Sequence, residues 1–160
     1  LLNIILEITG IETAMAVTTH AYTNSQKLLD SISNSDPRKN RSATTNIIPT
    51  TTGSSKLIGK IIPELYGKVT VSALRVPVAN VSLLEVTWIA PEKISEPYFL
   101  EQLSHIIQNK MGHIVAITDE MLVSSDYIGN NYSLVIDLNL ALFNNKMGKI
   151  YGWYDNEWAY

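Results

Sequence analysis

Residues 68–90, "KVTVSALRVPVANVSLLEVTWIA", decide the fold class because two strand-like runs follow each other there. The runs at 68–78 and 80–90 are rich in β-branched and apolar residues, a composition typical of β-strands. A tight turn around Ala79–Asn80 is predicted to join them. The centre of the domain is therefore expected to be a β-sheet.

Toward the N-terminus, the chain alternates between a strand, a loop and a helix. Residues 12–22 are small and β-branched and predict a buried strand. Residues 30–44 are polar, contain Pro37 and predict a long loop, which in a compact domain usually serves function. Apolar residues at helical spacing after Gly53 predict a helix that begins near Ser54.

Toward the C-terminus, the strongest pattern is a helix over residues 95–110, with Ser95 as its cap and Pro97 in its first turn. Residues 132–142 and 146–155 predict two further strands. Long strands interleaved with two helices indicate an α+β domain. The simplest architecture is a mostly antiparallel mixed sheet with the helices packed on one face.

Composition excludes several classes of protein. A chain of 160 residues with 46% hydrophobic residues is expected to form one globular domain, and its net charge of −3 gives no basic field for nucleic acid. No apolar run approaches the roughly 20 residues of a membrane helix. The first ten residues, "LLNIILEITG", lack a basic segment and resemble the interior of a helix rather than a signal peptide. A cytoplasmic location is expected.

The chain contains no cysteine, which excludes disulfides, thiolate metal sites and thiol nucleophiles within it. It contains three histidines, and neither these nor the carboxylates have the spacing of metal ligands. No metal site is therefore expected.

The stretch "TTTGSSK", residues 50–56, is a candidate phosphate site. A glycine turn that opens a helix presents unpaired N–H groups at the positive end of the helix dipole, and the threonines add hydroxyl donors. The spacing after Gly53 does not fit a Walker A loop. A well-capped helix without a ligand is the simpler interpretation of this stretch.

Two residues in strand-like segments carry candidate chemistry. Arg75 is a lone arginine in an apolar strand, so it needs either an internal carboxylate or a ligand anion. His20 follows a strand-like run among hydroxyl residues, where it could be a structural hydrogen-bonding residue or a catalytic one. The residues alone leave both pairs of alternatives open.

Four motifs occur together in one order: "THAYT" (19–23), "NIIPTTTG" (46–53), "LRVPVANVS" (74–82) and "GWYDNEWAY" (152–160). With these motifs, the chain resembles the catalytic domain of phosphorylating glyceraldehyde-3-phosphate dehydrogenase from about residue 10 to residue 160. The resemblance implies that residues 1–160 are a C-terminal catalytic domain and that the N-terminal NAD-binding Rossmann domain is absent from the chain. It also implies NAD as cofactor, a phosphorylated aldehyde and inorganic phosphate as substrates, a role in glycolysis and a homotetramer.

The resemblance assigns a catalytic role to one residue and phosphate-binding roles to four. His20 matches the histidine that activates a cysteine thiol and acts as base for hydride transfer. Thr23 and Arg75 match residues that hold the phosphate of the substrate. Thr52 and Gly53 match part of the site for the attacking inorganic phosphate.

The resemblance also suggests contacts with the cofactor. Asn156 matches the asparagine that holds the nicotinamide amide, and Tyr160 matches a tyrosine close to that ring. Arg38 and Arg41 match a loop that packs near the cofactor and a neighbouring subunit.

This sequence also departs from the family pattern. The family cysteine lies in an "SCTTN"-type segment upstream of the strand that carries His20, and these 160 residues do not include it. Ser25 stands where many members have Asp, which removes one partner at the phosphate site. The isolated chain is therefore expected to be inactive. Two alternatives stay open, namely erythrose-4-phosphate dehydrogenase and a non-catalytic remnant.

Overall fold

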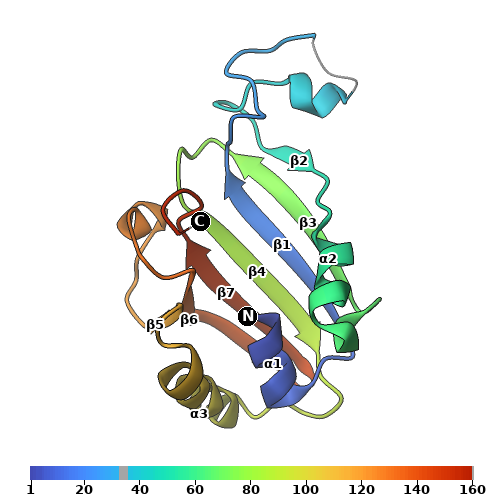
Figure 1. The fold of residues 1–160 in the computed structure, drawn as a ribbon, viewed down its shortest axis with the longest axis vertical. Helices are drawn as coiled ribbons and strands as arrows, with labels where there is room; N and C mark the ends of the chain where they lie inside the picture. Colours follow the sequence, from blue (N-terminus) through green and yellow to red (C-terminus); the bar gives the residue numbers. More distant parts are fainter. Residues whose placement is uncertain (33–35, 160) are drawn as a thin grey trace.

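The computed structural model describes residues 1–32 and 36–159, which form a seven-stranded sheet in the order β2-β3-β1-β4-β7-β6-β5 (Figure 1). The strands are β1 (Thr13–Ala21), β2 (Ile48–Thr50), β3 (Val69–Val76), β4 (Ser82–Ile89), β5 (Val115–Thr118), β6 (Leu134–Asn144) and β7 (Met147–Tyr154). β1 pairs with β3, and β5 with β6, in parallel, and all other neighbouring strands are antiparallel. The predicted mostly antiparallel mixed sheet is confirmed.

The two strands of residues 68–90 do not pair with each other. β1 lies between β3 and β4, and residues 77–81 connect the two strands around the C-terminal end of β1. The expected tight turn is thus a wider connection. Local composition identifies strands but contains no information about which distant strand will insert between them.

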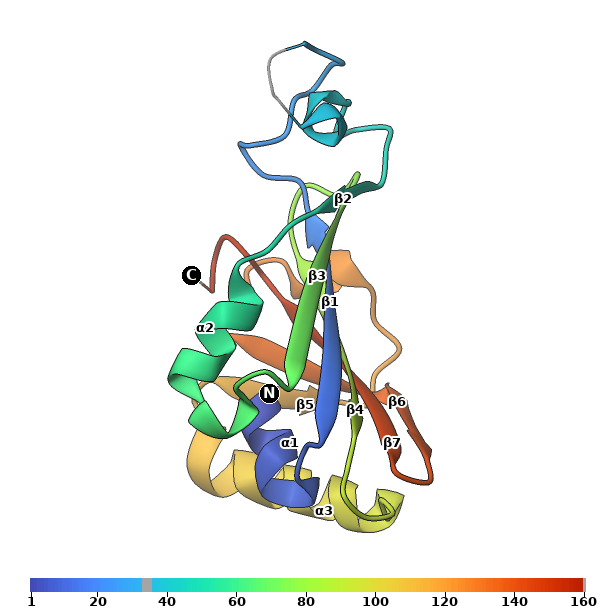
Figure 2. The same cartoon turned by 90° about the vertical axis from the view of Figure 1, so that its right-hand side faces the viewer.

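Three α-helices pack on one face of the sheet (Figure 2). They are α1 (Leu2–Thr9), α2 (Ser54–Ile61) and α3 (Glu96–Ile106), and α3 continues into a π-helical turn (Ile107–Met111). Short 3₁₀ turns lie at Pro37–Asn40, Pro63–Leu65 and Ser124–Tyr127. The predicted helix starts are confirmed, although the side chain of Ser95 makes no capping hydrogen bond.

An aromatic cluster joins α3 to the sheet. Phe99 of α3 is fully buried, and its ring centroid lies 5.4 Å from that of Trp88 on β4 and 5.2 Å from that of Phe143 on β6. Ile4 and Ile5 of α1 are equally buried in the same core. Because this core lies beneath the helices, it positions the beginnings of α1 and α2 over the sheet.

The opposite face of the sheet carries no α-helix among the described residues. The 3₁₀ turn Ser124–Tyr127 covers part of it, where the ring of Tyr127 stacks on that of Trp153, and another part exposes apolar side chains. Met15 is 68% exposed, Leu142 61%, Met147 46% and Ile89 40%. We call these four residues the open face. An exposed apolar patch of this kind on a globular domain commonly marks an interaction surface.

Between β1 and β2, the described residues 22–32 and 36–47 project beyond the end of the sheet and contain the 3₁₀ turn Pro37–Asn40 (Figure 1). In these parts the predicted loop of residues 30–44 is irregular apart from that turn, and its residues 33–35 lie outside the described ones. Within the described residues, no helix combines the length and apolarity needed to cross a membrane.

Candidate active site

His20 and Arg75 lie side by side where β1 and the parallel strand β3 approach their C-terminal ends. They are direct register partners. The Nδ1 atom of His20 lies 2.7 Å from the carbonyl oxygen of Ala21. Because a carbonyl oxygen only accepts hydrogen bonds, Nδ1 carries the hydrogen. In the neutral imidazole, Nε2 therefore keeps its lone pair and can accept a proton.

Arg75 has no carboxylate partner in the described part of the chain. Its Nη1 donates to the same Ala21 carbonyl at 3.1 Å, while its Nε is buried with no hydrogen-bond partner. The ion pairs of the described residues are Arg41–Asp30, Lys110–Glu7 and Lys149–Glu85. Of the two alternatives left open by the sequence, the internal ion pair is not formed. A buried guanidinium donor without a partner favours an anion from outside the chain.

The surroundings of His20 favour its neutral form. Burial lowers the pKa of His20, the hydrogen bond to the Ala21 carbonyl partly opposes this, and the positive charge of Arg75 lowers the pKa further. Burial also lowers the pKa of Arg75, but a guanidinium in a protein keeps its proton. The site therefore pairs a neutral imidazole base with a permanent positive charge.

His20 opens into a pocket of about 290 Å³ that it shares with Tyr154 and Asn156. The ring of Tyr154 meets the ring of His20 edge-on, with centroids 5.9 Å apart. The Tyr154 hydroxyl hydrogen-bonds to the Thr18 hydroxyl at 2.7 Å. Tyr154 thereby forms a fixed wall of the pocket.

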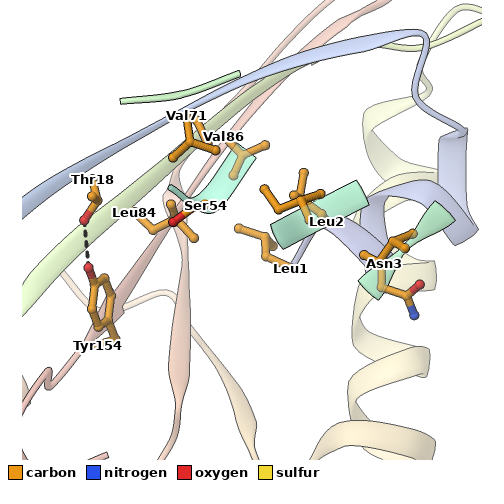
Figure 3. Close-up of a pocket in the computed structure, with 12 residues that line it drawn as sticks. Leu1, Leu2, Asn3, Thr18, Ser54, Val71, Leu84, Val86 and Tyr154 are labelled. Carbon is orange, nitrogen blue, oxygen red and sulfur yellow. Dashed lines mark hydrogen bonds between the residues drawn. The ribbon is translucent and has the colours of Figure 1, made fainter. Parts of the chain in front are cut away.

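A second, mostly apolar pocket of about 390 Å³ lies on the other side of Tyr154 (Figure 3). Leu1 and Leu2 of α1 and Ser54 of α2 line it together with sheet residues, and the Thr18–Tyr154 hydrogen bond lies at its edge. The beginnings of α1 and α2 thus meet at one pocket over the middle of the sheet, which shares Tyr154 with the pocket of His20.

Thr52 and Gly53 lie at the start of α2, as predicted. Gly53 is the N-cap residue, and the Thr52 hydroxyl accepts a hydrogen bond from the Ser54 backbone N–H at 3.2 Å. Thr52 thus satisfies one N–H at the helix start from the position before the N-cap, while the N-cap itself makes no side-chain hydrogen bond. Apart from its chain neighbours and its own helix, no described residue has an atom within 4 Å of where a Cβ of Gly53 would lie, so this end of α2 is open.

Thr23 belongs to a local cluster in the turn after β1. The side-chain oxygen of Gln26 accepts hydrogen bonds from the Thr23 backbone N–H at 2.8 Å and from the Thr23 hydroxyl at 3.0 Å. The Ser25 hydroxyl lies 3.1 Å from that of Thr23. The serine that replaces the common Asp therefore joins a network of neutral groups.

The remaining predicted residues differ in their surroundings. Asn156 lines the pocket of His20, whereas Tyr160 lies outside the described residues. Arg38 and Arg41 border a shallow hollow beside β2, and Arg41 pairs with Asp30 at the surface. Across the described ranges, no group of three or more potential metal ligands gathers.

Sequence reasoning missed three residues of this region, Tyr154, Ser82 and Asp155. Ser82 and Asp155 are both 1% exposed and hydrogen-bonded to the turn that contains Asn156. A polar residue inside an apolar strand, as Ser82 is, could have indicated a buried hydrogen-bond network.

With its helices on one face and its candidate residues at one end of the sheet, the fold is that of an α+β dehydrogenase catalytic domain. Residues 1–156 match the family described as glyceraldehyde 3-phosphate dehydrogenase, C-terminal domain. The chain belongs to this family.

Individual relatives agree with the family match. The chain is 39% identical to glyceraldehyde-3-phosphate dehydrogenase B of Aspergillus oryzae, over 94% of this chain and 46% of that protein. It is 40% identical to glyceraldehyde-3-phosphate dehydrogenase 2 of Danio rerio, over 94% and 45%. It is 39% identical to the enzyme of Chlamydia trachomatis serovar D, over 100% and 48%. The chain thus spans a little under half the length of these relatives.

Proposed function

We propose that this chain is the substrate-binding part of an NAD-dependent, phosphorylating glyceraldehyde-3-phosphate dehydrogenase. The observation that carries the proposal is the Arg75 guanidinium, which has a buried Nε without a partner and lies directly beside the neutral His20. A phosphorylated aldehyde supplies the anion that Arg75 lacks and places its reacting carbon near a base.

In this proposal, each predicted residue has one task. Arg75 and Thr23 bind the phosphate of the aldehyde. Thr52 and the open helix end at Gly53 bind inorganic phosphate, because backbone N–H groups at a helix start favour anions. His20 accepts a proton at Nε2, since Nδ1 is held as a donor by the Ala21 carbonyl.

One observation supports binding of the nicotinamide end of NAD in the pocket of His20. The Asn156 side-chain Nδ2 makes a long 3.5 Å contact with Glu157, so it retains donor capacity for a carboxamide oxygen. NAD supplies the hydride acceptor of the reaction. The residues of this chain contribute the orientation of the ring and the base beside it.

Because the chain contains no cysteine, these 160 residues do not supply a thiol nucleophile. We propose that the isolated chain does not reduce NAD in the presence of aldehyde. The intact mass of the native polypeptide tests this point. A species near 17.8 kDa would favour a non-catalytic remnant, and a larger species with an upstream cysteine would favour the enzyme.

We further propose that the open face is a contact between copies of the chain. Its four exposed apolar residues support this, because burying them against a second copy removes apolar area from water. Size-exclusion chromatography that shows a stable monomer would contradict this proposal.

Calorimetric titration with glyceraldehyde-3-phosphate tests the proposed function. The Arg75→Met variant is expected to bind it about 10- to 100-fold more weakly, because a charge-assisted hydrogen bond to the phosphate is lost. Lys146→Ala removes an exposed cation whose Nζ donates to the Pro91 carbonyl, away from the proposed site, and it serves as the control. Equal affinity of both variants would refute the role of Arg75.

A further inference from the structure

We infer that Ser82 is a positioning residue that fixes the orientation of the Asn156 amide toward the pocket. Ser82 lies at the first position of β4, is 1% exposed, and contacts both the strand of His20 and the turn of Asn156. The inference rests on the proposed function for the identity of the ligand, but its geometric part is independent of that function.

The direction of the hydrogen bonds follows from the groups involved. The Ala21 backbone N–H can only donate, and it donates to the Ser82 hydroxyl oxygen at 3.1 Å. Ser82 then has one hydrogen of its own, which it donates to Oδ1 of Asn156 at 2.7 Å. The chain of donors therefore runs from Ala21 through Ser82 to Asn156.

The reverse orientation of the Asn156 amide is unfavourable. If the amide flipped, its Nδ2 would face the second lone pair of the Ser82 oxygen, and the amide would no longer present an acceptor to the Ser82 hydrogen. The buried Ser82 hydrogen would lose the acceptor it now has, and an unsatisfied buried donor destabilises that arrangement. Ser82 thus selects the orientation in which Asn156 presents N–H donors to the pocket. Such donors suit a ligand carbonyl oxygen, such as that of a carboxamide.

The residue before Ser82 has an unusual backbone conformation, and hydrogen bonds of the neighbouring Asn80 hold it in place. Val81 has φ of 67°, a left-handed conformation that a β-branched residue rarely adopts. Its N–H donates to the Asn80 side-chain oxygen at 2.8 Å, and the Asn80 Nδ2 donates to Asp155 at 3.0 Å. Asn80 and Ser82 therefore clamp two consecutive residues, Asp155 and Asn156.

The same strand residue connects the amide to the base. Ala21 donates its N–H to Ser82, while its carbonyl oxygen accepts from both His20 and Arg75. A displacement of the end of β1 would shift these three contacts together. Ser82 therefore links the orientation of the amide with the position of the imidazole.

The first test measures the orientation directly by NMR in the wild-type protein at its native length. A flipped Asn156 amide brings its protons closer to residue 82, so nuclear Overhauser contacts between the two are expected to be weak in the wild type. In Ser82→Ala they are expected to strengthen, and in Ser82→Thr, which keeps the hydroxyl, they are expected to stay weak. Wild-type contacts as strong as those of a direct hydrogen bond from Nδ2 to the Ser82 hydroxyl would overturn the inference without recourse to any variant.

The second test compares two probes, nicotinamide mononucleotide and the same nucleotide without the carboxamide. The wild type is expected to prefer the carboxamide probe about tenfold, and Ser82→Ala is expected to lose most of this preference. Ser55→Ala is the matched control, because the Ser55 hydroxyl also accepts a strand N–H, from Val71 at 2.9 Å. Ser55 does not contact Asn156 in the described structure.

The outcomes separate the inference from the proposed function. If Ser82→Ala keeps the full preference, Ser82 does not position the amide. If the wild type itself shows no preference, the cofactor role of Asn156 fails. In that case, the NMR contacts alone decide whether Ser82 orients the amide.

Discussion

Replacing Asp155 with Asn should destabilise the fold strongly, because both oxygens of this buried carboxylate are fully used. Oδ1 accepts from the backbone N–H groups of Glu157 at 2.9 Å and Trp158 at 2.8 Å. Oδ2 accepts from Asn80 Nδ2 at 3.0 Å and from the Gly129 N–H at 2.8 Å. An asparagine side chain keeps one oxygen and turns an NH₂ group toward two of these four donors.

The magnitude follows from the two hydrogen bonds that are lost. Hydrogen bonds to a charged group contribute about 1.5–3 kcal/mol each, so Asp155→Asn should lower the free energy of unfolding by about 3–6 kcal/mol. At this chain length, the thermal midpoint should fall by roughly 10 °C. Thermal unfolding followed by near-ultraviolet circular dichroism at pH 7 measures the change. Asp119→Asn, at an exposed position, is the control.

The pH dependence gives a second, independent measurement. Burial alone would raise the pKa of Asp155, but the hydrogen bonds from Trp158, Gly129, Glu157 and Asn80 outweigh burial and lower the pKa below its ordinary value of 3.8. The carboxylate therefore stabilises the fold fully above that value, and its contribution disappears as the pH falls through the lower folded-state pKa. The difference between wild type and variant should shrink below pH 4. A constant difference, or an unchanged midpoint at pH 7, would refute this account of Asp155.

Three further predictions concern other parts of the molecule. An NMR titration should give His20 a pKa below its ordinary 6.5. The Arg75→Gln variant should raise the pKa of His20, because a neighbouring positive charge is removed, and an unchanged pKa in that variant would contradict the role of Arg75. Gly148→Ala should destabilise the fold by about 3 kcal/mol in urea unfolding, since a Cβ there would lie 2.4 Å from the ring of Trp88, and a neutral effect would show that the ring can move. Met147→Glu on the open face should shift size-exclusion profiles toward monomer, and an unchanged profile would place the subunit contact elsewhere.

Much of the fold could be predicted from local sequence patterns. The runs that became β1, β3, β4, β6 and β7 are long and rich in β-branched and apolar residues, and α2 and α3 begin where helix-start signals occur. β2 and β5 were missed, because three or four residues are too few to show a period.

The candidate site could be predicted only in part. The motifs identified His20, Arg75 and Asn156, which the structure connects through Ala21 and Ser82. Their functional roles stay predictions, as do those of Thr23 and Thr52, which make their hydrogen bonds within their own turns. The hydrogen bonds of Ser82 depend on strand order, and no local pattern encodes that order.

The strand order itself creates the site. Had residues 68–90 formed a hairpin, Arg75 and Ser82 would lie on adjacent strands with nothing between them. Instead, the connection passes around the end of β1, so Arg75 approaches Ala21 from β3 and Ser82 approaches it from β4. Both backbone polar groups of Ala21 are thereby used. Its carbonyl oxygen accepts from His20 and Arg75, and its N–H donates to Ser82, which binds the Asn156 amide. The Ala21 side chain points out of the plane of the sheet and is fully buried, so a bulkier side chain would overpack that face and displace the end of β1. We therefore expect Ala21→Val to disturb the environments of His20 and Asn156 together, which the NMR signals of both side chains would show.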